Sequence, residues 1–240
     1  MQKLLPLIDH DIPALTAQYA LDGRINIKSF FPADIATTLA SEIAGLNYQY
    51  ATYVDGLYQT LSEQDIQRYS PEQLAALQTK VLNYAQSGTG FWYGQARIDL
   101  PGTTITNTIP PLLQQLVETL NSQAMFRFIE QVTQQSSLIY TSAQATRYTP
   151  GCFLTRHNDV VEREGRRVAY VFGLTKEWHP DWGGLLHFYE QNGDNKDFWI
   201  PTFNNLALFD VTHPHAVSFI TPFAKHFRYS VTGWFRTSKP

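Results

Sequence analysis

The chain has 240 residues and a formal net charge of −3, with 43% hydrophobic, 14% aromatic and 16% charged residues. This length allows one large domain or two small ones, and so many aromatic side chains exclude a disordered chain. The acidic balance argues against nucleic acid as the main partner, because phosphate binding needs a basic surface. No apolar run approaches the ~18 residues of a membrane-spanning helix, and the single cysteine, Cys152, excludes an internal disulfide. We therefore expect a cytoplasmic protein without a membrane or nucleic-acid partner.

The chain up to residue 137 carries mostly helical patterns. Alternating polar and apolar residues predict a strand at 24–30, and an aromatic run predicts another at 91–98. Capping residues and apolar spacing predict four helices, which begin at Pro32, Ser70, Pro110 and Ser122. We expect this part of the chain to support the core and to shape substrate access, without supplying a metal ligand.

From residue 138 the pattern changes to short strands separated by glycine and proline. Many short strands at this spacing are typical of an antiparallel sandwich or barrel. The predicted strands are 138–148, 152–157, 167–174, 185–189, 198–200, 206–211, 216–220 and 228–236. The sequence therefore predicts a single domain over 1–240, mainly β with flanking helices. Residues 1–137 would form N-terminal helical support with some strands, packed against a jelly-roll core over 138–240.

His157 and Asp159 are the first candidate metal ligands. In an extended strand, residues i and i+2 point to the same side, so their ligand atoms can converge on one ion. A third ligand has to come from a neighbouring strand, and His213 and His215 are the candidates. Two histidines and one carboxylate form the facial arrangement of non-haem Fe(II) oxygenases, which leaves three coordination positions open. Zinc is the competing metal, although catalytic zinc usually keeps a single open position.

Arg228 begins an otherwise apolar strand that ends at Phe235. Burying an unpaired guanidinium is costly, so two interpretations remain open. The residue is either a solvent-exposed arginine at a strand end or a two-pronged partner for the carboxylate of a ligand. A keto acid that chelates the metal and places its far carboxylate on Arg228, as 2-oxoglutarate would, is consistent with the second interpretation.

Several motifs follow one another in a recognisable order. They are Tyr148–Leu154 leading to His157-Asn158-Asp159, Lys176-Glu177-Trp178, Gly183-Gly184, Pro214-His215-Ala216-Val217 and Arg228–Phe235. In this order they resemble the 2-oxoglutarate- and Fe(II)-dependent dioxygenases, specifically the prolyl 4-hydroxylase-like branch that includes the oxygen-sensing prolyl hydroxylases. The resemblance implies a double-stranded β-helix, which is a jelly roll, as the catalytic core.

The resemblance also implies roles for individual residues. His157, Asp159 and His215 would be the Fe(II) ligands and the catalytic centre, and Arg228 would bind the C5 carboxylate of 2-oxoglutarate. Only His215 is followed by Ala-Val as the family requires, which favours it over His213. The remaining implied residues are Tyr148, Thr232 and Trp234 in the cosubstrate pocket and Arg166 facing the substrate.

Two departures from the family pattern leave alternatives open. An apparent insertion makes Lys225 a rival for the carboxylate, and we prefer Arg228 because it directly precedes the Tyr-Ser-Val-Thr-Gly-Trp strand. Gly173 stands where the oxygen-sensing members have a tyrosine that helps hold 2-oxoglutarate. Tyr148 or Tyr170 would therefore have to serve as the second anchor.

The implied activity is hydroxylation of an unactivated C–H bond, with Fe(II) as cofactor, 2-oxoglutarate and O2 as cosubstrates, and ascorbate as a candidate reductant. The leading substrate is a prolyl residue of a protein or peptide. The alternatives are the same chemistry on a free amino acid or other small molecule, a non-catalytic jelly-roll binding module, and a zinc hydrolase. The polar segment 55–69 is either a lid over the site or an ordinary surface connection.

Overall fold

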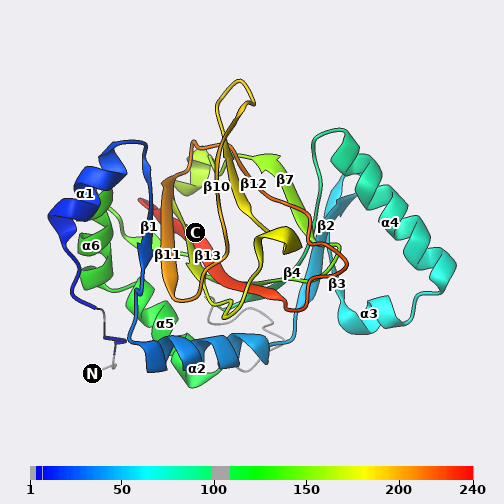
Figure 1. Cartoon of the computed structure of the whole chain (residues 1–240), viewed down its shortest axis with the longest axis horizontal. Helices are drawn as coiled ribbons and strands as arrows, with labels where there is room; N and C mark the ends of the chain where they lie inside the picture. Colours follow the sequence, from blue (N-terminus) through cyan, green and yellow to red (C-terminus); the bar gives the residue numbers. More distant parts are fainter. Residues whose placement is uncertain (1–3, 7, 99–108, 240) are drawn as a thin grey trace.

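A single curved sheet forms the centre of the structure, a computed structural model that describes residues 4–6, 8–98 and 109–239. Its larger half contains, in spatial order, β1 (Arg24–Lys28), β11 (Asn205–Asp210), β8 (Arg166–Gly173), β13 (Arg228–Arg236), β6 (Gln144–Tyr148) and β4 (Phe91–Arg97). Its smaller half contains β7 (Phe153–His157), β12 (His215–Val217), β9 (Leu186–Tyr189) and β10 (Asn195–Trp199). Because β4 pairs with both β6 and β7, the two halves are continuous. The predicted jelly-roll fold is confirmed (Figure 1).

Helices cover the larger half of the sheet on the face turned away from the smaller half (Figure 1). They are α1 (Ile12–Ala20), α2 (Ala33–Ala44), α5 (Pro111–Leu120) and α6 (Gln123–Thr133). In β8, Tyr170 and Phe172 belong to the core under these helices, whereas Ala169 packs in the cluster on the opposite face. Successive side chains of a strand point to opposite faces of the sheet, so β8 contributes side chains to the layers on both of its faces. None of the described helices is long and apolar enough to cross a membrane.

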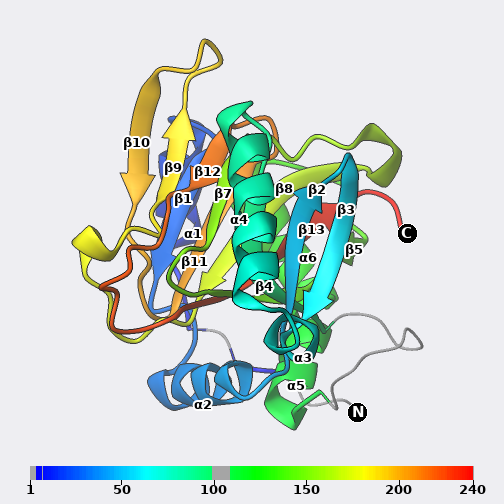
Figure 2. The ribbon, with the colours of Figure 1, turned by 90° about the vertical axis from the view of Figure 1, so that its right-hand side faces the viewer.

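A hairpin and two further helices extend the sheet on one side, which faces the viewer in Figure 2. The hairpin consists of β2 (Gln49–Val54) and β3 (Leu57–Ser62), and β2 also pairs with β4. It is followed by α3 (Glu63–Gln67) and by α4 (Pro71–Gln86), which packs on β2. The two-residue strand β5 (Tyr140–Thr141) pairs with β13.

The structure differs from the sequence-based prediction at two N-terminal places. Helix α1 was not predicted, although Asp11 caps it by accepting a hydrogen bond from the Ala14 N–H. Residues 49–54 form β2, and residues 55–69 include β3 and α3, none of which was predicted. Asp55 and Gly56 both have positive φ, at 53° and 76°, as a tight hairpin turn requires. The role of this segment as a lid stays a prediction.

The division of the domain at residues 137 and 138 also stays a prediction. The sheet itself crosses that point, because β1 pairs with β11 and β4 pairs with β6 and β7. The N-terminal part therefore contributes strands to the same sheet, in addition to helices that cover it.

We predict that Phe172→Ala lowers the free energy of unfolding by about 3–5 kcal/mol, the usual cost of truncating a buried phenylalanine. Phe172 is 1% exposed and makes an edge-to-face contact with Phe31, at 5.1 Å between ring centroids. Urea unfolding measures the change. The matched control is Phe223→Ala, at a ring that is 63% exposed, with an expected change below about 0.5 kcal/mol. Equal losses in the two variants would contradict this description of the core.

Candidate active site

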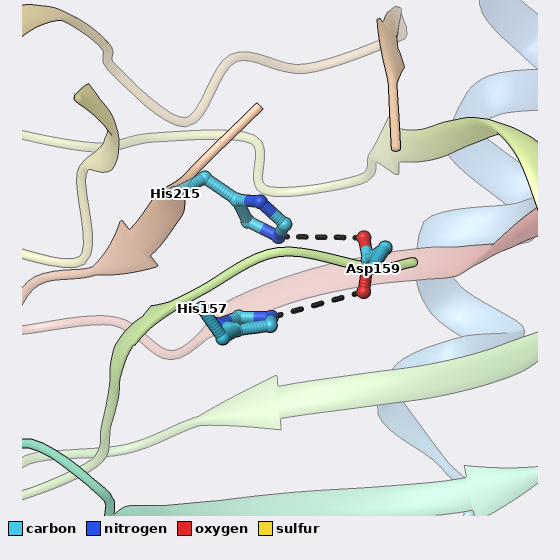
Figure 3. A group of neighbouring side chains, drawn as sticks. All are labelled: His157, Asp159 and His215. Atoms are coloured by element: carbon cyan, nitrogen blue, oxygen red, sulfur yellow. Dashed lines mark ion pairs between the residues drawn. The ribbon is translucent and has the colours of Figure 1, made fainter. Parts of the chain in front are cut away.

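His157, Asp159 and His215 converge on one point between β7 and β12 (Figure 3). The two strands pair antiparallel with His157 directly opposite His215. The Nε2 atoms of His157 and His215 lie 3.8 and 3.5 Å from the two carboxylate oxygens of Asp159. Among the described residues, this is the one group of three or more histidine, cysteine or acidic side chains whose ligand atoms could hold a metal ion.

The position of Asp159 differs from the strand geometry that the sequence predicts. β7 ends at His157, so Asp159 lies in the loop that follows and not at an i+2 position within the strand. Its backbone N–H donates a 2.9 Å hydrogen bond to the carbonyl oxygen of Val211. This bond ties the loop to the segment that follows β11 and directs the carboxylate toward both histidines.

Backbone contacts orient both imidazole rings. Nδ1 of His157 lies 2.9 Å from the carbonyl oxygen of Thr155, and Nδ1 of His215 lies 2.9 Å from that of His213. A carbonyl can only accept, so each Nδ1 donates in these hydrogen bonds, and in a neutral ring the lone pair is then on Nε2. Burial lowers the pKa of His215 to about 4, with the Asp159 carboxylate opposing that shift. The ring is therefore neutral at physiological pH, as a metal ligand must be.

The three donors fit a divalent transition-metal ion. Two imidazole nitrogens and one carboxylate oxygen are the donor set of non-haem Fe(II) oxygenases, and the carbonyl contacts at Nδ1 are typical of metal-binding histidines. His213 does not join the group, because its Nε2 lies 2.8 Å from the carbonyl oxygen of Asp22. The structure thus brings together the predicted triad and leaves out the rival histidine.

A cavity of about 460 Å³ extends from the triad between the two halves of the sheet. Arg228 is in its lining, although only 4% of the residue is exposed. Within the described part of the chain, no carboxylate forms an ion pair with this guanidinium. It donates a hydrogen bond to the hydroxyl of Tyr148, which stands directly opposite in the β6–β13 pairing. Burial lowers the pKa of Arg228, but a guanidinium stays protonated in proteins, so the cavity contains a buried, uncompensated cation.

The rival anchor Lys225 lies elsewhere. It is exposed and lines a different hollow, together with Lys176 and Glu177. The assignment of Arg228 rather than Lys225 stays a prediction, and the positions of the two side chains agree with it.

The other predicted pocket residues line the same cavity as the triad: Tyr148, Thr232, Trp234 and Arg166. Arg166 stacks on Trp234, with 3.6 Å from its guanidinium carbon to a ring centroid, and its Nη1 lies 3.9 Å from an Asp159 oxygen. It therefore lies between the triad and the outer part of the cavity.

Of the two tyrosines considered for the missing anchor, Tyr148 lies beside Arg228, whereas the Tyr170 hydroxyl donates to the carbonyl of Ser142 at 2.9 Å. At Gly173 a Cβ would come within 2.2 Å of both the Asn205 side chain and the Thr202 carbonyl, so no larger residue fits without movement. These contacts favour Tyr148 as the second anchor.

Among the lining residues that were not predicted from the sequence, two lie on neighbouring strands. Tyr93 of β4 stacks on Tyr148 with 5.2 Å between ring centroids, and Gln144 of β6 hydrogen-bonds to Tyr93. The aromatic strand 91–98 was predicted. Which residues of other strands lie beside it depends on the pairing of β4 with β6, and periodicity alone does not reveal that pairing.

Residues 143–236 match the sequence model of the 2OG-Fe(II) oxygenase superfamily. This segment belongs to that superfamily. Over 86 residues the chain is also 35% identical to prolyl 3-hydroxylase OGFOD1 of Mus musculus, an alignment that covers 33% of this chain. The chain spans only 15% of the length of that relative.

Solved structures of related enzymes share the oxygenase fold over nearly the whole chain. A prolyl-4-hydroxylase from Pseudomonas putida is 23% identical, with a TM-score of 0.62, over 95% of this chain and 100% of the other. A prolyl hydroxylase from Trichoplax adhaerens, solved with a hypoxia inducible factor peptide fragment, is 17% identical with a TM-score of 0.60, over 94% and 89%. The chain therefore shares the fold of these two prolyl hydroxylases.

We predict that His157→Ala and His215→Ala each lose bound iron, because each variant removes one of three donors, whereas His213→Ala keeps it. Metal content per chain after anaerobic loading with Fe(II) measures this directly. The His213→Ala variant loses one hydrogen bond to a backbone carbonyl, worth about 1 kcal/mol, so its melting should change only modestly. Iron loss in His213→Ala together with retention in His215→Ala would reverse the assignment.

Proposed function

We propose that the chain is an Fe(II)- and 2-oxoglutarate-dependent dioxygenase that hydroxylates a prolyl residue of a protein or peptide. The observation that carries this proposal is one cavity that contains both the His157, Asp159 and His215 triad and the buried guanidinium of Arg228. A metal site alone suits many reactions. A metal site paired with a buried cation that has no carboxylate partner among the described residues suits an anionic chelating cosubstrate.

The proposed roles follow from these positions. His157, Asp159 and His215 hold the metal, and Arg228 binds the C5 carboxylate of 2-oxoglutarate with two parallel N–H donors. Tyr148 orients that guanidinium through its hydroxyl, and a Ser230–Thr146 hydroxyl pair, 2.7 Å apart, lines the same cavity. The implied pocket roles of Thr232 and Trp234 rest on their place in the cavity lining.

When bound, Fe(II) supplies the oxidation in which 2-oxoglutarate and O2 become succinate and CO2 while one oxygen atom enters a substrate C–H bond. The protein contributes binding, orientation and exclusion of water. The apolar side chains of Leu186, Phe209 and Val217 line the cavity and lower the local polarity around the triad. Low local polarity strengthens the pairing of Arg228 with an anion.

A polypeptide substrate is favoured over a free amino acid or other small molecule. The cavity is not closed, since several of its lining residues also line a larger hollow at the surface. A closed pocket would favour a small molecule, whereas an outward opening can admit one residue of a longer chain. The names of the relatives, a prolyl 3-hydroxylase and prolyl 4-hydroxylases, agree with proline as the target. A cytoplasmic location and a need for ascorbate remain predictions from the sequence.

Succinate release tests the proposed activity. Purified chain with Fe(II), 2-oxoglutarate and O2 should release succinate, and removal of the metal with a chelator should abolish that release until Fe(II) is restored. Proline-containing peptides that gain the mass of one oxygen atom would identify the product. Restoration of turnover by Zn2+ instead of Fe(II) would contradict the oxygenase assignment and favour the hydrolase alternative.

We predict that Arg228→Ala weakens the apparent affinity for 2-oxoglutarate by about thirty-fold or more. Truncating one partner of a buried charge pair costs roughly 2–5 kcal/mol, and each ~1.4 kcal/mol is tenfold. Succinate release against 2-oxoglutarate concentration, at saturating iron, gives the affinity. Lys225→Ala is the control and should change it less than about threefold, because that side chain is exposed and outside the cavity. A large loss confined to Lys225→Ala would reverse the assignment.

A further inference from the structure

A second, larger cavity of about 850 Å³ continues the inner cavity toward the surface. The two share lining residues from several strands: Tyr58, Tyr93, Gln144, Arg166, Thr232 and Trp234. The outer cavity is lined by residues of β3, β5 and the C-terminal end of β13, strands that lie on the right in Figure 2. A chain segment on either side of a residue held at the triad would therefore pass through this outer cavity.

Positive charge dominates the outer cavity. Its described lining includes five cationic side chains, Arg97, Arg163, Arg166, Arg236 and Lys239, and one carboxylate, that of Glu164. The single carboxylate is shared, because it lies 2.9 Å from a nitrogen of Arg166 and 2.9 Å from one of Arg236. The whole chain carries a net charge of −3, so this concentration of cations is local and does not reflect overall composition.

Arg163 and Lys239 contribute exposed positive charge to the cavity. Both side chains are exposed, and within residues 4–6, 8–98 and 109–239 neither forms an ion pair. Both charges are therefore available to a ligand of opposite charge that enters the cavity.

Backbone contacts hold the two residues on neighbouring segments. Arg163 lies in the short 3-10 helix Glu162–Glu164, which ends at Gly165 in the left-handed conformation, with φ 57°. The Thr237 N–H donates a 2.9 Å hydrogen bond to the Gly165 carbonyl, and a Cβ at Gly165 would come 2.7 Å from the Thr237 hydroxyl oxygen. Close packing at this glycine therefore places the segment that carries Lys239 beside the segment that carries Arg163.

We propose that the outer cavity binds an acidic segment of the substrate polypeptide, next to the residue that enters the inner cavity. This inference rests on the proposed function and adds the class of substrate to it. A cleft lined by one sign of charge attracts and orients a partner of the opposite sign. The Tyr58 hydroxyl in the lining accepts a hydrogen bond from Gln95 Nε2, so its own O–H can donate to a peptide carbonyl. A peptide is favoured over a polynucleotide because the cavity leads to a pocket of about 460 Å³ and the chain as a whole is acidic.

Three labelled peptides test the inference with the full chain. Each has a central proline flanked by alanines and by four Glu, four Gln or four Lys residues. Binding is measured by fluorescence anisotropy with Fe(II) and 2-oxoglutarate present and O2 excluded, so that no turnover occurs. We expect the Glu peptide to bind about tenfold more tightly than the Gln peptide at low salt, and the Lys peptide to bind most weakly. The preference should shrink as salt screens the charges.

The charge-reversal variant Arg163→Glu/Lys239→Glu should reduce the preference for the Glu peptide to less than about threefold. The matched control, Lys28→Glu/Arg127→Glu, changes the net charge equally at exposed positions outside both cavities and should keep the preference. Both variants should retain the slow succinate release that occurs without peptide, since neither pair of residues belongs to the metal or 2-oxoglutarate site.

The outcomes separate the two proposals. Equal affinity for the Glu and Gln peptides, with intact succinate release, overturns the acidic-substrate inference and leaves the oxygenase proposal standing. Loss of the preference in both double variants also overturns it, because the effect would then be one of net charge. A twelve-residue oligouridylate that displaces the Glu peptide at lower concentration identifies a nucleic-acid site instead. Wild-type chain that releases no succinate contradicts the oxygenase proposal, whatever the peptide affinities are.

Discussion

The pairing of β7 with β12 is the constraint on which the candidate site depends. It puts His157 opposite His215, and the same short strand β12 pairs on its other edge with β9, where Phe188 stands opposite His215. The Phe209 ring contacts the His215 imidazole edge-on at 4.8 Å between centroids. A strand of three residues is thus bonded on both edges and packed from the sheet behind it. The pairing and packing of β12 therefore preorganise the ligand side chains, as tight and selective metal binding requires.

In the larger half of the sheet, side chains on one face of a strand pack in the core and side chains on the other face line the cavity. On β8, the large side chains of Tyr170 and Phe172 fill the core beneath the helices, while the small Ala169 and the Val171 side chain face the cavity. Small residues on that face leave room for a ligand, and large residues on the other face supply the stability. One strand therefore serves both the packed layer and the cavity, and Tyr170 of the core also belongs to the cavity lining.

The parts of the site that could be predicted are those encoded by local pattern. His157 and Asp159 lie two residues apart, and Arg228 begins its strand as expected, directly opposite Tyr148. The family resemblance separated His215 from His213, and the structure gives the physical reason, since His213 contacts the Asp22 backbone. Tyr93 and Gln144 could not be predicted to face the site because their places depend on strand order. The Asp55-Gly56 turn was predictable from residue type alone. The hairpin was not, because β3, which follows the turn, is largely exposed and alternates only weakly between polar and apolar residues.

The contact between Gly165 and Thr237 has a practical consequence for handling the protein. It places Lys239 in the wall of the outer cavity, so anything fused behind the last strand begins at the rim of that cavity. A histidine-rich purification tag attached there would carry additional imidazoles close to the opening that leads to the metal ligands. Helix α1, at the other end of the chain, packs with α6 on the helical face of the sheet (Figure 1). Fusions, labels and surface attachment belong at that end if the entrance is to stay open.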